Sequence, residues 1–143
     1  TKAEFEQSEF SDKKGLYSVV RRDNEGKLTS VSFSEIYHDQ MKRAAAILDE
    51  AAKFADDKEF ANYLTMRAQA LRTDEYQASD FAWMDMKNNP IDVVIGPIES
   101  YDDQLYGYRA AFESYVLIKD LAWSEKLAKY AQFLPELQMA LHH

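Results

Sequence analysis

The spacing of apolar residues changes along the chain, and each change marks a different kind of element. From Ser34 the apolar positions recur every three or four residues. That is the period of one helical face, so it predicts a helix near 34–55. The same spacing returns later and predicts helices near 58–72, 75–87 and 121–134. The short junction between the first two helices predicts an antiparallel pair.

Other segments carry the pattern of strands. β-Branched and aromatic residues lie on both sides of Asn24–Gly26 and predict a hairpin with strands near 16–22 and 27–32. An extended segment is expected over 91–98, and residues 108–118 alternate with apolar side chains on both faces, which is typical of a buried strand. The prediction is therefore a mainly helical α+β fold with antiparallel helices, a hairpin and one buried strand.

Length and composition favour one packed unit. The chain has 143 residues, of which 46% are hydrophobic, and this is enough to bury one substantial core. We expect a single globular domain over 16–141 and a partly ordered arm over 1–15, where no period is sustained. Residues 142–143 are a possible tag. No apolar run approaches the roughly 18 residues that span a bilayer, which predicts no membrane partner and favours a cytoplasmic location.

Charge and missing motifs exclude several classes of function. A net charge of -8 disfavours binding to nucleic acid or to an anionic membrane. The chain has no cysteine, and it lacks HExxH, a glycine-rich phosphate loop, G-x-S-x-G and a Nudix-type run of glutamates. Apart from the two C-terminal histidines, His38 is its only imidazole. We therefore expect no metal site and no cofactor within this segment.

An acidic, aromatic turn, "IGPIESYDDQLYGYRAAFE", separates two strand-like segments. Taken alone, Glu99 and Glu113 can act as an acid and base pair if the turn brings them within about 5 to 10 Å. The plainer interpretation is that Asp102 and Asp103 stabilise a turn while Glu99 is solvated. Composition alone does not decide between these two interpretations.

The order of residue types in this turn resembles dipeptidyl peptidase III-type zinc metallopeptidases, where a Gly-x-Ile-Glu-[Ser/Thr]-Tyr run precedes an Asp, a Gly and an aromatic-Glu pair. The matching residues are Gly96, Ile98, Glu99, Ser100, Tyr101, Asp102, Gly107, Phe112 and Glu113. The chain departs from the family in having Gln104 where a proline is usual and Ala111 before the aromatic-Glu pair. The histidine pair of the family's zinc helices would lie C-terminal of this segment and is not in this chain.

The resemblance implies a role for each matching polar residue. Glu99, with Glu113 nearby, would bind the free amino terminus of a peptide substrate, and Tyr101 would be the catalytic donor to the tetrahedral oxyanion. Zinc, held on the missing lobe of a parent chain, would activate the water. The residues that would shape the turn are Gly96, Asp102 and Gly107.

Two hypotheses of different classes follow. The leading one is the substrate-binding portion of a zinc-dependent exopeptidase that releases dipeptides from peptide N-termini and is inactive as an isolated segment. Its partners would be the peptide, the zinc lobe of the parent and, for the segment alone, another copy in a homo-oligomer. The alternative is a non-catalytic helical interaction module whose acidic turn binds a basic or amine-bearing partner. An unrelated enzyme using Glu99 and Glu113 stays open beside them.

Overall fold

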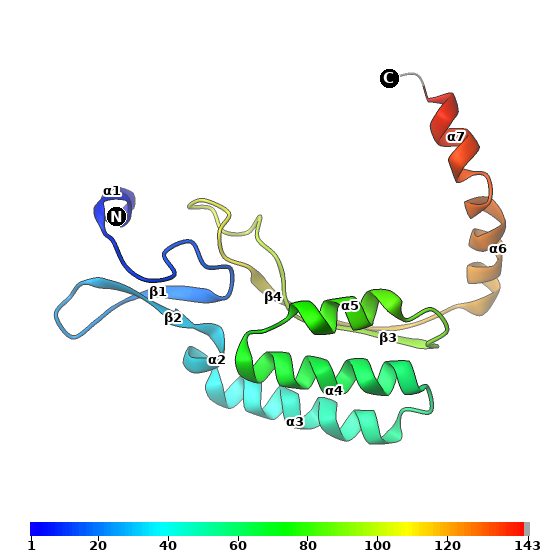
Figure 1. The fold of residues 1–143 in the computed structure, drawn as a ribbon, viewed down its shortest axis with the longest axis horizontal. Coiled ribbons are helices and arrows are strands. Elements are labelled where there is room, and N and C mark those ends of the chain that lie inside the picture. The colour runs from blue at the N-terminus through cyan, green and yellow to red at the C-terminus, as the bar shows by residue number, and fades with distance from the viewer. Residues whose placement is uncertain (142–143) are drawn as a thin grey trace.

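The computed structural model describes residues 1–141 and shows a mainly helical α+β fold with two small antiparallel sheets (Figure 1). Residues 142–143, a possible tag, lie outside the described part. The helices are α1 (Lys2–Gln7), α2 (Phe33–Ile36), α3 (His38–Phe54), α4 (Lys58–Thr73), α5 (Gln77–Asp85), α6 (Leu121–Ala131) and α7 (Leu134–Ala140). The strands are β1 (Ser18–Arg22), β2 (Leu28–Ser32), β3 (Ile91–Glu99) and β4 (Ala111–Ile118).

The core lies among α3, α4 and α5, which run side by side (Figure 1). The predicted helix over 34–55 is divided at Tyr37, whose φ of -110° and ψ of 28° leave the helical region, into α2 and α3. α4 begins where Asp57 caps it by accepting a hydrogen bond from the backbone N–H of Phe60 at 2.9 Å. The buried apolar residues of this core are Met41, Ala45, Leu48, Phe60, Tyr63, Leu64, Ala68, Ala70, Leu71, Tyr76 and Met86.

The second sheet packs against this core through β3. Val93 and Ile95 pack on the apolar cluster, and the phenol of Tyr63 donates to the carbonyl of Val93 at 2.6 Å. β4 pairs antiparallel with β3, so the strand predicted over 108–118 is present, although it begins only at Ala111. Its predicted burial is wrong. Val116 is 69% exposed, because the described chain places a partner strand beside β4 but no layer over it.

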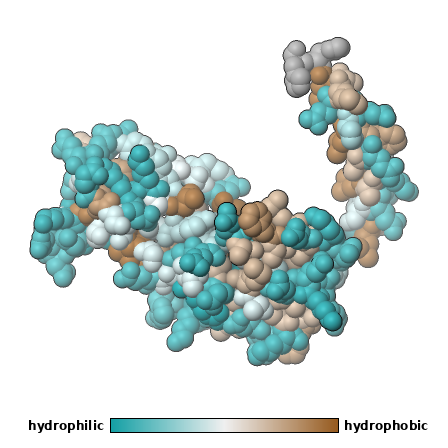
Figure 2. Space-filling view, viewed as in Figure 1, coloured by the Kyte–Doolittle hydropathy of each residue, from teal (hydrophilic) through white to brown (hydrophobic). Residues whose placement is uncertain are grey.

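The last two helices leave the body of the molecule. Figure 1 shows α6 and α7 as an arm that extends from the end of β4, and no residue in either helix is buried. The globular domain expected over 16–141 is therefore not packed over its final segment. Pro135 separates the two helices by taking a place in the first turn of α7, where a missing N–H costs nothing. The apolar side chains along this arm are exposed (Figure 2).

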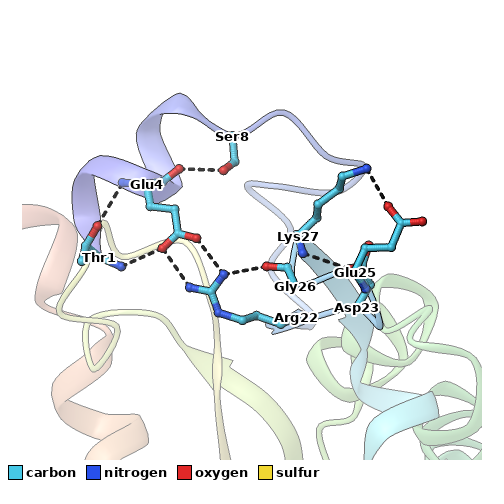
Figure 3. Close-up of polar contacts among 8 residues, drawn as sticks. All are labelled: Thr1, Glu4, Ser8, Arg22, Asp23, Glu25, Gly26 and Lys27. Carbon is cyan, nitrogen blue, oxygen red and sulfur yellow. Dashed lines mark hydrogen bonds and ion pairs between the residues drawn. The ribbon is translucent and has the colours of Figure 1, made fainter.

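The N-terminal arm contains a short helix that sequence periodicity did not reveal. Thr1 and Glu4 form a capping box at the start of α1, and Phe5 is buried. As Figure 3 shows, the Glu4 carboxylate also accepts two hydrogen bonds from the guanidinium of Arg22, at 2.7 and 2.9 Å. Arg22 in turn donates to the carbonyl of Gly26 in the hairpin turn at 2.7 Å. The arm is thus tied to the β1–β2 hairpin by a bidentate ion pair.

This ion pair predicts an unusual titration. The hydrogen bonds from Arg22, followed by that from the N-terminal ammonium, lower the pKa of Glu4 to about 2. Because the folded pKa lies below the unfolded one, the contact stabilises the folded arm above about pH 4.3 and is lost as the pH falls towards 2. We expect an NMR titration of the Glu4 carboxyl to show a midpoint near 2, and a clearly higher midpoint in Arg22→Gln, where only the N-terminal ammonium remains to lower the pKa. The matched control is Arg21→Gln, and an ordinary Glu4 midpoint in the unmodified chain would contradict the ion pair.

Candidate functional site

The loop between β3 and β4 is organised by one carboxylate. Asp103 accepts hydrogen bonds from the backbone N–H groups of Leu105, Tyr108 and Arg109, at 3.1, 2.9 and 3.2 Å. Partial burial raises the pKa of the Asp103 carboxyl, but the three backbone donors outweigh this and lower it overall. Where a backbone N–H of the described loop donates to a side chain, the acceptor is Asp103 and not Asp102, the matching residue that the resemblance assigned to the turn.

Two glycines allow the chain to enter and leave this loop. Gly107 has a φ of 66°, in the left-handed region, and its N–H donates to the carbonyl of Asp103 at 2.9 Å. Gly96, within β3, has a φ of 135°, which side-chain-bearing residues rarely adopt. Both positions therefore favour glycine for backbone reasons.

The strand register brings the acidic residues to one face of the sheet. A β-bulge lies between Pro97 and Glu99, and Glu99 pairs with Ala111. Cross-strand partners point to the same side, and side chains alternate along β4. Glu99 therefore shares a face with Glu113 and Tyr115. The bulge sets this arrangement, since a shift of one residue would turn Glu99 to the opposite face.

Tyr101 lies in the field of these carboxylates. The charge of Glu99, with smaller contributions that include Asp102 and Glu113, raises the pKa of the Tyr101 phenol. The Glu113 carboxylate, as a hydrogen-bond acceptor, raises the pKa of Tyr115, and Glu99 and Tyr101 add to that shift. The structure thus gathers Glu99, Tyr101 and Glu113, the three polar residues singled out from sequence. It adds Tyr115, which strand alternation placed on the face of Glu113 without giving it a role.

Glu99 and Tyr101 differ in exposure in a way that suits different tasks. The Oε2 atom of Glu99 is buried and has no hydrogen-bond partner among the described residues. A buried carboxylate oxygen without a donor is unfavourable, so this position favours a cationic or N–H-bearing ligand. Tyr101 is 74% exposed, and its raised pKa keeps the phenol protonated and able to donate at neutral pH. The site can therefore accept an ammonium and donate one hydrogen bond beside it.

The N-terminal arm supports this loop from the other side. The phenol of Tyr106 donates to the carboxylate of Glu6, and the ring of Tyr106 lies 5.6 Å from that of Phe5 between centroids. The guanidinium of Arg109 donates to the carbonyl of Lys13 at 3.0 Å. Sequence reasoning missed these contacts, because they join residues about one hundred positions apart.

The described residues do not form a metal-binding site. Within residues 1–141 there is no group of three or more His, Asp and Glu side chains placed to hold a metal ion. The cluster of Glu99, Tyr101, Glu113 and Tyr115 supplies carboxylates and phenols but no imidazole. Residues 1–141 therefore do not fit a zinc site. In the same described range, no helix has the length and hydropathy needed to cross a membrane.

The chain matches a known protein family and is similar to solved structures of two proteins. The model of the family described as Peptidase family M49 matches residues 6–139. The structure of dipeptidyl peptidase III from Caldithrix abyssi is similar to 92% of the chain, with a TM-score of 0.85 and 40% identity. That of dipeptidyl-peptidase III from Corallococcus sp. strain EGB is similar to 99% of the chain, with a TM-score of 0.83 and 33% identity.

A curated relative gives a narrower match. Nudix hydrolase 3 of Arabidopsis thaliana is 37% identical over 98 residues, which are 68% of this chain but 13% of that protein. The Nudix-type glutamate run does not occur in this sequence. The chain likewise spans 25% and 27% of the two solved chains. The similarity therefore concerns one part of each of these longer proteins.

Proposed function

The chain belongs to peptidase family M49, and from that premise we propose that it is the substrate-binding portion of a zinc-dependent exopeptidase that releases dipeptides from peptide N-termini. The observation that carries the proposal is the buried, unpartnered Oε2 of Glu99 beside the exposed phenol of Tyr101. A peptide with a free amino terminus supplies the missing donor. A charge-assisted contact of this kind contributes roughly 1.5 to 3 kcal/mol.

The roles divide between the residues of the cluster. Glu99 binds the substrate ammonium and so measures the distance from the peptide's first residue to the bond that is cleaved. Glu113, on the same face of the sheet, adds negative charge that attracts the same ammonium. Tyr101 donates its phenolic hydrogen to the oxygen that becomes negative as the carbonyl is attacked. Zinc would be held by residues outside this chain, and the chemistry it supplies when bound is activation of the attacking water.

The test of the proposal uses the full-length protein that contains this chain. Incubation with a peptide bearing a free amino terminus should release dipeptides in sequence, as mass spectrometry would detect, while the N-acetylated peptide should be cleaved far more slowly. Equal cleavage of both peptides would overturn the role of Glu99. A protein that binds amines but cleaves nothing would favour the alternative, a non-catalytic interaction module.

The cytoplasmic location favoured above stays a prediction.

The isolated chain should be inactive. With one histidine among residues 1–141, it lacks the three or four ligands that hold a catalytic zinc. We expect calorimetry on a variant without residues 142–143 to show no stoichiometric zinc binding, and peptide assays to show no hydrolysis. Tight zinc binding by that variant would contradict the assignment of the metal to another part of the protein.

The isolated chain should also self-associate. Val116 and Ile118 on β4 are 69% and 83% exposed, and the apolar side chains of α6 and α7 are exposed as well. Such surfaces favour a partner, either the zinc lobe of the parent or another copy. We expect sedimentation velocity to show species larger than a monomer as concentration rises, and Val116→Lys to reduce them. The matched control is Thr65→Lys on the exposed side of α4, and a clean monomer at high concentration would contradict the expectation.

A further inference from the structure

One buried charge in the helical core has no part in the site described so far. Arg67 of α4 is 3% exposed, and its Nη2 donates to the carboxylate of Asp80 on α5. Its Nε and Nη1 have no hydrogen-bond partner within residues 1–141. The guanidinium lies 5.6 Å from the ring centroid of Tyr63 and 5.5 Å from that of Tyr76. Burying an incompletely paired arginine costs free energy that an apolar side chain of similar volume would avoid.

The guanidinium lies against the backbone of β3 at its most unusual residue. A Cβ placed on Gly96 would come 3.3 Å from Nη1 of Arg67 and 3.2 Å from Cε1 of Tyr76. The strand therefore lies so close to these two side chains that a glycine at this position is in near contact with them. Tyr63, one helical turn before Arg67, donates its hydroxyl to the carbonyl of Val93 at 2.6 Å. Two residues on one face of α4 thus contact β3 at two successive points.

The later of these contacts, at Gly96, lies three residues before Glu99, the proposed recognition residue. The β-bulge follows Gly96 and lies between Pro97 and Glu99. Arg67, Pro97 and Ile98 line one cavity of about 310 Å³, so the guanidinium also borders the bulge. Because a bulge redirects the side chains that follow it, the position of the strand at Gly96 sets the direction of Glu99.

We propose that Arg67 is a positioning residue for substrate recognition. Tied to Asp80 and enclosed by Tyr63 and Tyr76, its planar guanidinium holds the β3 backbone at Gly96, and thereby holds the Glu99 carboxylate where a peptide ammonium binds. The inference rests on the proposed function of Glu99. It explains why an arginine occupies a core position of α4, and why the strand residue that lies against it is a glycine.

The experiment compares a ligand that carries the ammonium recognised by Glu99 with one whose nitrogen is acetylated and uncharged. The dissociation constants of a dipeptide amide with a free amino group and of its N-acetyl counterpart are measured by calorimetry on the full-length protein. Arg67→Met should weaken the free amine on the order of tenfold and leave the acetylated ligand nearly unchanged, since a small displacement of a binding group is costly. A purely structural role would weaken both ligands alike. Arg72→Met is the matched control, because Arg72 lies on the same helix and pairs with Asp49 at the surface.

Further variants keep the test decisive. If Arg67→Met fails to fold, Asp80→Asn takes its place. The Asp80 side chain is 50% exposed, so the substitution should be tolerated, and removing its charge weakens the ion pair that holds one end of the guanidinium. Asp80→Asn should also weaken binding of the free amine more than binding of the acetylated ligand, by a smaller factor than Arg67→Met. Gly96→Ala should reproduce the selective loss, and combining it with Arg67→Met should cost less than the product of the two effects.

The outcomes separate this inference from the proposed function. If Glu99→Gln abolishes the preference for the free amine while folded Arg67→Met or Asp80→Asn leaves it intact, the positioning role is wrong. If Glu99→Gln itself leaves the preference unchanged, the proposed function fails, and the positioning role fails with it because no recognition remains to be positioned.

Discussion

Glu99→Gln in the full-length protein should weaken peptides with a free amino terminus by roughly 10- to 100-fold, the equivalent of a charge-assisted hydrogen bond of about 1.5 to 3 kcal/mol. Glutamine keeps the size and hydrogen-bonding capacity of the side chain but removes its negative charge. The loss should therefore be confined to ligands that carry an ammonium. The measurement is the KM or dissociation constant for matched free and N-acetylated peptides.

A control is available on the same chain. Glu125→Gln removes one carboxylate from α6, away from the loop cluster, and should leave the ratio between free and acetylated peptides unchanged. If Glu99→Gln weakened both kinds of peptide equally, the side chain would contribute to general stability or packing and not to recognition of the amino terminus. A surface role alone would change the free energy of unfolding by less than about 1 kcal/mol and leave binding intact.

Tyr101→Phe should lower kcat by on the order of 100-fold or more while changing substrate affinity far less. The substitution removes only the phenolic hydrogen-bond donor, and in the proposed mechanism that donor meets an oxygen that becomes negative only during the reaction. Because Glu99 raises the pKa of the phenol above its ordinary value near 10, the donor should remain protonated throughout the neutral range. The activity that depends on the Tyr101 phenol should be lost only as the pH rises through the raised pKa of that phenol.

The neighbouring phenol provides the matched control for this experiment. Tyr115 lies on the face of Glu113 and is 51% exposed, so Tyr115→Phe removes a similar group from the same surface. We expect its effect on kcat to be much smaller. Should Tyr115→Phe reduce turnover while Tyr101→Phe keeps it near the original value, the donor would have to be reassigned. Single-turnover kinetics on both variants would separate the chemical step from product release.

Local features of the fold follow from the amino-acid pattern alone. The recurrence of apolar residues at three and four positions set α3 and α4, because the helical period places such residues on one face whatever lies opposite. Turn residues at Asn24–Gly26 set the first hairpin for an equally local reason, and Gly26 does take a positive φ of 81°. The resemblance of the acidic turn to the dipeptidyl peptidase III family was confirmed by the family match over residues 6–139.

Errors arose where one segment depends on another. The strand ending at Ile118 was predicted to be buried because both its faces are apolar, yet burial needs a covering layer that the described chain does not provide. α1 was not found because it is held by a capping box, Phe5 and an ion pair to Arg22, and none of these produces a period. Sequence reasoning named both Asp102 and Asp103 for the turn, and the direction of the backbone in the loop decides that Asp103 accepts the hydrogen bonds.

The sequence by itself singled out Glu99, Tyr101 and Glu113 as candidates, because they stand in an order of residue types that resembles the dipeptidyl peptidase III family. Only the tertiary structure decided what they can do together. The face shared by Glu99 and Glu113 depends on a bulged register between two strands, and the buried oxygen of Glu99 depends on side chains that pack around it. The placement of Arg67 beneath Gly96 is decided in the same way, since a helix position is encoded locally but the strand laid across it is not. Side-chain type is a property of the chain, whereas distance between remote residues is a property of the packing.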